Sequence, residues 1–473
     1  MSNPPNHTHL VVVGAGPAGY PAAFMAADLG LDVVLVDQNL NPGGVCLYQG
    51  CIPSKTYLHA AKLIHEAREA VDWGIDFGHP QVDLDKMRKW KDQVVSKLTG
   101  GLGQLSMQRR IEFHQARAVF QDSHTLILKK ADAEESVLSF DYALIATGSR
   151  PNTMPHLNIS SPRVMDSTEA LKLTEIPKSL LVVGGGYIGL ELGTVYAALG
   201  AEVSVVEAAT GLLPRADRDL VELLHRRIER IFKSIYVGTK VAELKDEGTG
   251  IRAKLLGVDV PDQERFEKVL LSIGRRPNSN DLGLENTHIE MDEKGFIKVD
   301  GQRRTSEPHI FAAGDVAGEP MLAHKATHEA RVAVETIAGK LALFEGQAVP
   351  AVVFTDPEVA WCGLTETQAR IENRKVRIAR FPWTASGRAT TLDRNDGMTK
   401  LVLEPQGEQI LGVGIVGVGA GELIAEGVLA VEMAATAQDL KMTIHAHPTL
   451  SETVMEAAEV FFGHSAHLYP HKS

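Results

Sequence analysis

The 473-residue sequence is poor in cysteine, in aromatic residues and in long uninterrupted apolar runs. Three cysteines in a chain of this length do not provide the disulfide framework that small secreted domains use. The most apolar stretch, 179–207, contains Glu191, Glu202 and many glycines, so it does not predict a membrane span. The first ten residues are polar and lack a basic segment, which predicts a cytoplasmic protein without a signal peptide.

The chain also has no excess of positive charge and no low-complexity segment. The formal net charge is −12 and the pI is near 5.9, so we expect neither nucleic-acid binding nor attachment to an anionic membrane. Hydrophobic residues make up 44% and charged residues 23%, which is typical of a soluble globular protein. At about 150 residues per domain, the length predicts roughly three domains.

Two segments of the sequence, 9–38 and 179–208, repeat one pattern of strand, glycine turn, helix and strand. The turn glycines are Gly14, Gly16 and Gly19 in the first copy and Gly184, Gly186 and Gly189 in the second. In each copy an acid, Asp37 or Glu207, follows the first glycine by 23 residues. Such glycines let the backbone approach a pyrophosphate at a helix N-terminus, and the acid accepts hydrogen bonds from a ribose.

A single glycine pattern of this kind is a weak signal, but two copies with the same internal spacing favour two dinucleotides in one chain. The alternative is that both layers are structural and bind nothing. Glu207 is followed by Ala208, Ala209 and Thr210 with no adjacent arginine, which favours NAD over NADP in the second copy. The runs 143–151 and 309–316 are predicted strands that return to the first sheet on either side of an inserted NAD unit.

The stretch GGVCLYQGCIPSK places Cys46 and Cys51 directly after the first nucleotide unit. In a regular helix five positions rise by about 7.5 Å, which is too far for a disulfide, so the backbone must bend here. Gly50 permits such a bend. Spacing alone leaves three alternatives, namely a redox pair, a structural disulfide or half of a zinc site, although Cys362 lies far away with no thiol beside it. A ligand of the first unit that faces these thiols should accept electrons from them, which favours a flavin.

Taken together, these motifs resemble the flavin-dependent pyridine nucleotide–disulfide oxidoreductases over essentially the whole chain. The similarity includes GGVC-x4-CIPSK at 43–55, ATGSRP at 146–151, GGGYIGLELG at 184–193, GRRPN at 274–278, AAGDV at 312–316 and HAHPTLSE at 445–452. The resemblance implies a bound FAD, a bound NAD and a catalytic disulfide between Cys46 and Cys51. Within the family, HPTLSE is most similar to the members that oxidise dihydrolipoamide.

The resemblance also implies roles for single residues. Cys51 contacts the flavin, Cys46 exchanges with substrate, Lys55 pairs with Glu191 beside the flavin, and His447 is the acid–base oriented by Glu452. The residues implied to bind FAD are Gly14, Gly16, Gly19, Asp37, Gly43, Gly44, Val45, Lys55, Ala118, Thr147, Gly148, Asp315 and Ala323. Those implied to bind NAD are Gly184, Gly186, Tyr187, Gly189, Glu207, Val241 and Gly274.

Simpler explanations exist for several of these residues. Lys55 could be a solvated helix lysine, and His447 could be an ordinary surface or core histidine among the 18 in the chain. Thr449 and Glu452 also fit a helix capping box. A chain that keeps only the fold, as a non-catalytic assembly subunit, would not need both cysteines together with His447 and Glu452.

The implied activity is oxidation of protein-bound dihydrolipoamide with reduction of NAD⁺. The implied partners are a second copy of the chain, with which it shares active sites, and the lipoyl-bearing domains of 2-oxoacid dehydrogenase or glycine cleavage complexes. The runner-up is a related reductase of another disulfide such as glutathione, because Tyr187 stands where glutathione reductases have tyrosine. Tyr48-Gln49 and Asp37 also depart from the usual pattern.

The predicted fold class is α/β, with two Rossmann-like dinucleotide-binding domains and a C-terminal α+β interface domain. We expect an FAD domain at 1–150 that includes the cysteine pair, and an NAD domain at 151–279. Residues 280–350 complete the FAD domain, and residues 351–473 form the dimerisation domain.

Overall fold

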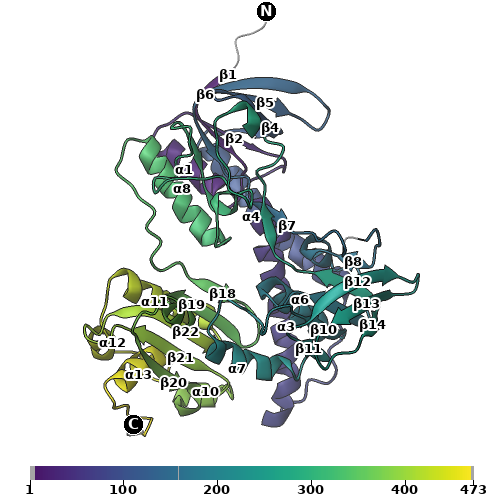
Figure 1. Cartoon of the computed structure of the whole chain (residues 1–473), viewed down its shortest axis with the longest axis vertical. Coiled ribbons are helices and arrows are strands. Elements are labelled where there is room, and N and C mark those ends of the chain that lie inside the picture. The colour runs from purple at the N-terminus through teal and green to yellow at the C-terminus, as the bar shows by residue number, and fades with distance from the viewer. Residues whose placement is uncertain (1–5, 158, 470–473) are drawn as a thin grey trace, which may run out of the picture.

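A computed structural model describes residues 6–157 and 159–469 of the chain. In this range the structure is α/β, with two mainly parallel sheets followed by an antiparallel sheet in the C-terminal part. The three sheets and their helices form three lobes (Figure 1). No helix in the described part is both long and apolar enough to cross a membrane.

The first sheet contains seven strands in the order β3-β2-β1-β6-β5-β4, with β17 pairing to β6. Its central strands run parallel, and their segments 10–13, 33–36 and 143–145 are buried, which suits their aliphatic residues. The strands are β1 (Asn6–Val13), β2 (Val33–Asp37), β3 (Glu112–Gln115), β4 (Arg117–Asp122), β5 (Thr125–Lys129), β6 (Glu135–Ile145) and β17 (Ile310–Ala312). Because β17 pairs with β6, the prediction that the 309–316 run returns to the first sheet is confirmed.

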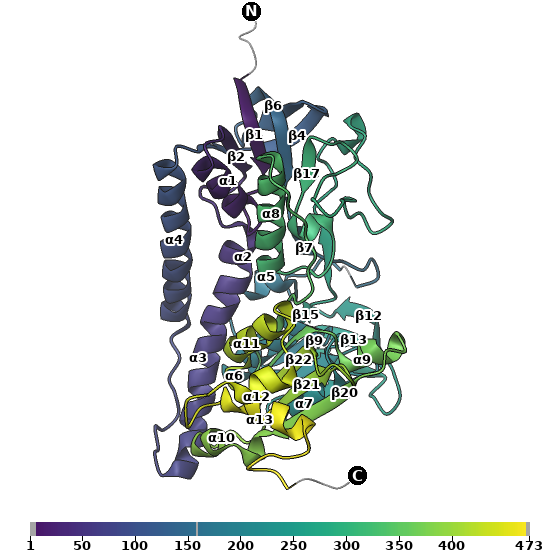
Figure 2. The same cartoon turned by 90° about the vertical axis from the view of Figure 1, so that its left-hand side faces the viewer.

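The helices around the first sheet include the two that carry the cysteine pair. They are α1 (Gly19–Asp28), α2 (Gly44–Gln49), α3 (Cys51–Glu69), α4 (Leu84–Gln108) and α8 (Ala323–Ile337), with short 3₁₀ turns η1 (Ala70–Trp73), η2 (Leu284–Asn286) and η3 (Gly314–Ala317). Helices α1 and α8 pack against each other through small residues such as Ala23 and Ala330. Helix α3 runs from this lobe down beside the other two (Figure 2).

The second sheet is parallel throughout and has the order β11-β10-β9-β15-β8. Its strands are β8 (Val164–Met165), β9 (Ser179–Val183), β10 (Glu202–Val206), β11 (Ser234–Tyr236) and β15 (Lys268–Leu271). The helices of this lobe are α5 (Ser167–Ala170), α6 (Tyr187–Ala198) and α7 (Arg218–Ile228). An antiparallel sheet of β12 (Lys240–Asp246), β13 (Ile251–Leu256) and β14 (Gln263–Phe266) adjoins it, and the ribbon of β7 (Ser149–Pro151) and β16 (Arg275–Pro277) joins this lobe to the first.

The third sheet is antiparallel in the order β18-β19-β22-β21-β20. Its strands are β18 (Ala351–Val353), β19 (Glu358–Gly363), β20 (Arg377–Pro382), β21 (Met398–Leu403) and β22 (Ile410–Gly417). The helices around it are α9 (Glu366–Ile371), α10 (Gly387–Thr391), α11 (Ala420–Glu432), α12 (Ala437–Met442) and α13 (Glu452–Phe461), with the turn η4 (Trp383–Ala385). Trp383, fully buried, anchors its core.

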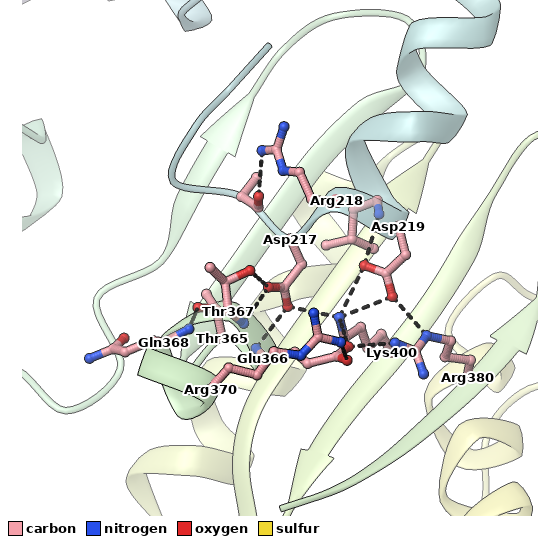
Figure 3. Close-up of polar contacts among 12 residues, drawn as sticks. Asp217, Arg218, Asp219, Thr365, Glu366, Thr367, Gln368, Arg370, Arg380 and Lys400 are labelled. Carbon is pink, nitrogen blue, oxygen red and sulfur yellow. Dashed lines mark hydrogen bonds and ion pairs between the residues drawn. The ribbon is translucent and has the colours of Figure 1, made fainter. Parts of the chain in front are cut away.

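A buried ion cluster attaches the second lobe to the third (Figure 3). The Lys400 ammonium of β21 lies 2.8 Å from Asp217, 2.8 Å from Glu366 and 3.0 Å from Asp219, and the Lys400 side chain is 1% exposed. The three carboxylates have the mutual spacing of metal ligands. The Lys400 ammonium lies among them, and the Arg380 guanidinium contacts Asp219 at 2.7 Å and also Glu366, so two cations of the chain offset much of their charge.

Asp217 also caps a helix that belongs to the other lobe. Its two carboxylate oxygens accept the backbone N–H of Glu366 and of Thr367, each at 2.9 Å, at the start of α9. A carboxylate at a helix N-terminus satisfies unpaired N–H donors and the positive end of the helix dipole. The contact therefore fixes the orientation of the second lobe against the third.

Candidate redox site and nucleotide cavity

The cysteine pair lies where α2 ends and α3 begins. Gly50, between the two helices, has φ −143° and ψ −113°, so the helical path is broken at that residue. The break brings Cys46, on α2, into hydrogen-bonding contact with Cys51, the first residue of α3. The irregular backbone that the sequence required for such a contact is present at the glycine expected to provide it.

The two thiols are chemically unequal. The hydrogen bond from Cys46 lowers the pKa of Cys51 to about 7; burial opposes this shift and the Lys55 ammonium assists it. The same hydrogen bond, together with burial, raises the pKa of Cys46 far above that of a free thiol. In the dithiol state Cys51 is therefore the thiolate and Cys46 keeps the proton, and thiolates are the form that donates electrons and attacks disulfides.

Lys55 connects all three lobes beside this pair. Its Nζ lies 2.7 Å from Oε2 of Glu191 on α6, and Glu191 is 3% exposed. The other oxygen of Glu191 accepts the Phe354 N–H at 3.0 Å, and the Lys55 ammonium lies 4.5 Å from the centre of the Phe354 ring. The predicted contact of Lys55 with Glu191 is present, so Lys55 is not a freely solvated helix lysine.

A cavity of about 720 Å³ extends from the thiols between the first and second lobes. Cys46, Cys51 and Lys55 form part of its wall. Among the predicted residues, it is also lined by Gly14, Gly16, Asp37, Gly44, Val45, Ala118, Thr147, Gly148, Tyr187, Glu191, Asp315 and Ala323. The volume lies within the range of small-molecule and cofactor sites.

Other predicted residues do not line this cavity. They are Gly19, Gly43, Gly184, Gly186, Gly189, Glu207, Val241, Gly274, His447 and Glu452. Gly19 and Gly189 serve the packing of the turns, because a Cβ at either would lie 1.7 Å or 2.2 Å from the first glycine's carbonyl oxygen. The Val241 side chain is buried in the core of the second lobe, so only its backbone is free to face a ligand.

The two glycine turns are built alike. Asp37 accepts the Ala15 N–H and Glu207 accepts the Gly185 N–H, each at 2.7 Å. Each acid at the end of a second strand therefore holds the glycine turn of its own unit. A carboxylate oxygen has room for a second donor such as a ribose hydroxyl.

The middle glycine of the second turn is free of packing constraints. A Cβ on Gly186 would meet no atom within 4 Å, whereas Gly184 has φ +109° and its Cβ would lie 2.4 Å from the Ser272 carbonyl oxygen. The fold therefore requires Gly184 but not Gly186, which leaves open backbone at a helix N-terminus. This is the cradle that a pyrophosphate needs, so the residues present fit a dinucleotide.

We predict that Gly186→Ala leaves the protein folded but weakens NAD binding, because the added methyl projects into the space that the ligand needs. Calorimetric titration with NAD⁺ should show a dissociation constant raised on the order of tenfold, with the thermal midpoint within about 2 °C of the parent. Gly184→Ala should instead lower the thermal midpoint. Unchanged NAD⁺ affinity in folded Gly186→Ala would contradict this assignment.

Three residues beside the cavity were not predicted. Ser149 donates to Asp315 at 2.5 Å and accepts from the Arg275 guanidinium at 2.7 Å. Ser149 lies in the ATGSRP motif and Arg275 in the GRRPN motif, so position in a motif could have identified them. Glu329 of α8 accepts the Gly314 N–H at 2.7 Å and holds the turn that carries Asp315, but no local pattern marks it.

His447 and Glu452 lie together in the third lobe. His447 Nδ1 is 2.9 Å from Oε1 of Glu452, and the histidine side chain is 74% exposed. The second Glu452 oxygen accepts the Thr449 N–H at 2.7 Å, which is one half of a capping box. The other half of a capping box would be a side chain that accepts a backbone N–H at the start of α13, and α13 has no such side-chain cap. Burial opposes ionisation of Glu452, yet the Thr449 N–H and His447 lower its pKa, and the carboxylate stays charged beside the imidazole.

The chain is similar to known proteins over nearly all of its length. The chain is 48% identical to a dihydrolipoyl dehydrogenase of Haemophilus influenzae, over 96% of this chain and 95% of that protein. It is equally 48% identical to a dihydrolipoyl dehydrogenase of Vibrio parahaemolyticus, with the same coverage of both chains. The crystal structure of LpdA from Mycobacterium tuberculosis superposes with a TM-score of 0.88 at 26% identity, over 96% of this chain and 99% of that one.

Two family models match successive parts of the chain. Residues 8–330 match the pyridine nucleotide-disulphide oxidoreductase model. Residues 349–458 match the dimerisation domain of the same proteins. With two repeated nucleotide units, a contacting cysteine pair on the cavity wall and matches over both parts, the chain belongs to the pyridine nucleotide-disulphide oxidoreductase family.

Proposed function

We propose that the protein oxidises dihydrolipoamide to lipoamide and reduces NAD⁺ to NADH, using Cys46 and Cys51 as a redox disulfide. The observation that carries this proposal is the contact of two unequal thiols on the wall of a cavity that lies between two nucleotide-binding units. The 48% identity to proteins named dihydrolipoyl dehydrogenase supports this substrate over glutathione.

The chain's own residues divide the chemistry between them. One substrate sulfur attacks Cys46 Sγ, the Cys46–Cys51 bond breaks, and Cys51 leaves as a thiolate. The second substrate sulfur then attacks the first, which releases lipoamide and returns Cys46 as a thiol. His447, held by Glu452, takes a proton from the incoming dithiol, because an imidazole near pH 7 can accept one and the carboxylate stabilises the resulting cation.

The lowered pKa of Cys51 suits it to be the electron donor of the pair. FAD, when bound, supplies the two-electron carrier between Cys51 and NAD⁺. The residues proposed to hold FAD are the members of the predicted FAD set that line the cavity, together with Gly19 and Gly43, which do not line it and shape the backbone. Those proposed for NAD are Gly184, Gly186, Tyr187, Gly189, Glu207, Val241 and Gly274. The domain boundaries near 150, 279 and 350 are part of the same proposal.

The comparison that tests this function is turnover of free dihydrolipoamide with NAD⁺ against turnover of glutathione disulfide with NADPH. The kcat/KM of the FAD-loaded protein for dihydrolipoamide should exceed its kcat/KM for glutathione disulfide at least about a thousandfold. Recognition of glutathione requires contacts to a charged tripeptide, which differ from the contacts that dihydrolipoamide needs. Comparable efficiency with glutathione disulfide would favour the runner-up, which Tyr187 on the cavity wall supports.

We predict a preference for NAD⁺ over NADP⁺ because Glu207 would meet a 2′-phosphate with like charge. Both Glu207 oxygens already accept backbone N–H groups, and the nearby Arg218 guanidinium is committed to the carbonyls of Leu212, Leu213 and Ala216. The ratio of kcat/KM values should favour NAD⁺ by about two orders of magnitude, on the scale of a like-charge contact that no nearby cation offsets. Equal values for the two nucleotides would refute the assignment of Glu207.

The working unit is proposed to be a homodimer with shared active sites. The match of residues 349–458 to a dimerisation domain supports the dimer. His447 is exposed on the third lobe and does not line the cavity that contains the cysteines. A histidine so placed is free to serve the cysteine pair of a second chain, and a twofold axis then makes two equal sites. The proposed partners of the dimer are lipoyl-bearing domains of 2-oxoacid dehydrogenase or glycine cleavage complexes.

A further inference from the structure

The loop 443–451, between the end of α12 and the start of α13, carries His447. No backbone N–H from Ile444 to His447 donates to a backbone carbonyl within the described chain. Position 448 is proline and has no N–H to donate. A loop with so few backbone hydrogen bonds takes one conformation only where its side chains fix it. The side-chain contacts of this loop therefore decide where His447 lies.

His445 is the residue of this loop that points into the third lobe. Its neighbours Ile444 and Ala446 are exposed, whereas the His445 side chain is only 6% exposed. Its Nε2 lies 2.7 Å from Oε1 of Glu426 on α11, and its Nδ1 lies 3.0 Å from the Thr443 carbonyl oxygen. The contact with Glu426 joins the loop to α11.

Both ring nitrogens of His445 face oxygen acceptors. A carbonyl oxygen and a carboxylate accept hydrogen bonds and donate none, so both nitrogens have to donate. Only the doubly protonated imidazole ring has two N–H groups. His445 therefore meets Glu426 as a cation, and a hydrogen bond between two charged groups is stronger than one between neutral groups.

The partner of His445 is anchored in the core of the third lobe. Helix α11 packs against β19 and β22, which are adjacent strands of the third sheet. At Gly427, next to Glu426, an added Cβ would lie 2.8 Å from Val413 of β22, so helix and strand are in close contact. The loop is thereby held to α11 at His445 as well as to α13 at His447.

This second attachment matters for the proposed function. A general base must come within about 2.6–3.2 Å of the atom whose proton it takes. The proposed target of His447 lies on a second chain, so the whole loop, and not only the imidazole ring, needs a fixed position. A misplacement of about 1 Å reduces a rate on the order of a hundredfold.

We propose that His445 and Glu426 position the loop 443–451 so that His447 projects from it toward the cysteine pair of a second chain. This proposal rests on the proposed function. Neither His445 nor Glu426 lines the cavity that contains the thiols. Both residues act through His447, so they are positioning residues and not catalytic ones.

The test compares His445→Ala with the parent, with His445→Gln and with the control His225→Ala. The alanine removes both ring hydrogen bonds, while the glutamine amide can still donate to Glu426. His225 lies 3.1 Å from Glu229 on α7, so the control removes a histidine–glutamate pair outside both the loop and the thiol cavity. His445→Gln also serves as the second variant in case His445→Ala is unstable.

The first readout separates the half-reactions of the FAD-loaded protein by stopped-flow absorbance. Flavin reduction by dihydrolipoamide, which uses His447, should be slowed on the order of tenfold or more in His445→Ala, and His445→Gln should recover part of the loss. Reduction of ferricyanide by NADH bypasses the thiols and His447, so its rate should equal that of the parent in every variant. A general loss of structure would lower both rates.

The second readout needs no dithiol. Crystal structures of the FAD-loaded parent and of His445→Ala, in one crystal form, should show residues 443–449 displaced or in several conformations only in the variant. Parent-like flavin reduction in His445→Ala, equal slowing in His225→Ala or an unmoved loop would overturn the positioning role. Absence of dihydrolipoamide turnover in the parent would instead refute the proposed function, and the crystal structures would still decide whether His445 holds the loop.

Discussion

Cys46→Ser is expected to abolish dihydrolipoamide oxidation and to give the oxidised, FAD-loaded protein a long-wavelength absorbance band at rest. Without Cys46 no disulfide forms, and turnover should fall by at least about a thousandfold. Cys51 then remains as a thiolate next to the flavin, because Lys55 still lowers its pKa and a serine hydroxyl can still donate to it. A thiolate facing an oxidised flavin produces a charge-transfer band, which a visible spectrum at pH 8 detects.

The matched variant is Cys51→Ser, which removes the thiolate and keeps Cys46. It should be equally inactive but should lack the band, since burial still raises the pKa of Cys46 and keeps the proton on its thiol. A band in Cys51→Ser and none in Cys46→Ser would mean that the two cysteines have the opposite roles.

Lys400→Met is expected to be the most destabilising single change outside the redox site. Removing the ammonium takes from Asp217 the only ion-pair partner that the structure shows for it, and leaves the Arg380 guanidinium to offset Asp219 and Glu366 in a largely buried cluster. Loss of one partner from a buried ion pair costs about 3–5 kcal/mol. Chemical denaturation should show this loss in the free energy of unfolding, provided that the transition stays two-state.

The control is Arg370→Met, which removes a cation that contacts the same Glu366 but is 75% exposed. An exposed pair of this type contributes about 0–1 kcal/mol, so the control should be nearly neutral. Similar decreases in the free energy of unfolding in the two variants would show that the cost does not depend on the burial of Lys400.

The pH dependence of the Lys400 cluster follows from the same contacts. Burial opposes charge on Asp217 and Asp219, but Lys400 and their other donors lower the pKa of both in the folded protein. A lowered folded pKa stabilises the protein above the unfolded value of about 3.9, and the contribution is lost as the pH falls through the folded values. The stability difference between parent and Lys400→Met should therefore shrink below about pH 4.

The repeated nucleotide units were predictable because their signals are local. Strand, glycine turn, helix, strand and acid lie within 30 consecutive residues, 9–38 and 179–208, and the positive φ angles and close contacts at Gly14 and Gly184 require glycine in those turns. The bend that brings Cys46 to Cys51 was predictable for the same reason, since Gly50 is adjacent to Cys51; the redox role of the pair followed from family resemblance. The Lys55–Glu191 and His447–Glu452 contacts followed from family resemblance rather than from any pattern of spacing.

What the sequence did not reveal depends on contacts between distant segments. Lys400 meets Asp217 across 183 positions, and nothing near either residue marks the partner. Asp217 caps a helix in another lobe, although its own neighbourhood suggests a cap for α7. The Lys55 ammonium meets the Phe354 ring because α3 packs against the third lobe, so no single stretch of sequence encodes that contact.

The most direct test of the central claim, that a cysteine pair and a histidine from two chains form one dithiol-oxidising site, mixes Cys46→Ser with His447→Gln. Each variant is inactive alone, and the mixture is taken through conditions that dissociate and reform dimers, with exchange confirmed by mass. In a heterodimer one site collects both lesions and the other collects none. Random exchange should restore activity at about a quarter of all sites. No recovered dihydrolipoamide oxidation, despite confirmed exchange, would contradict the shared site.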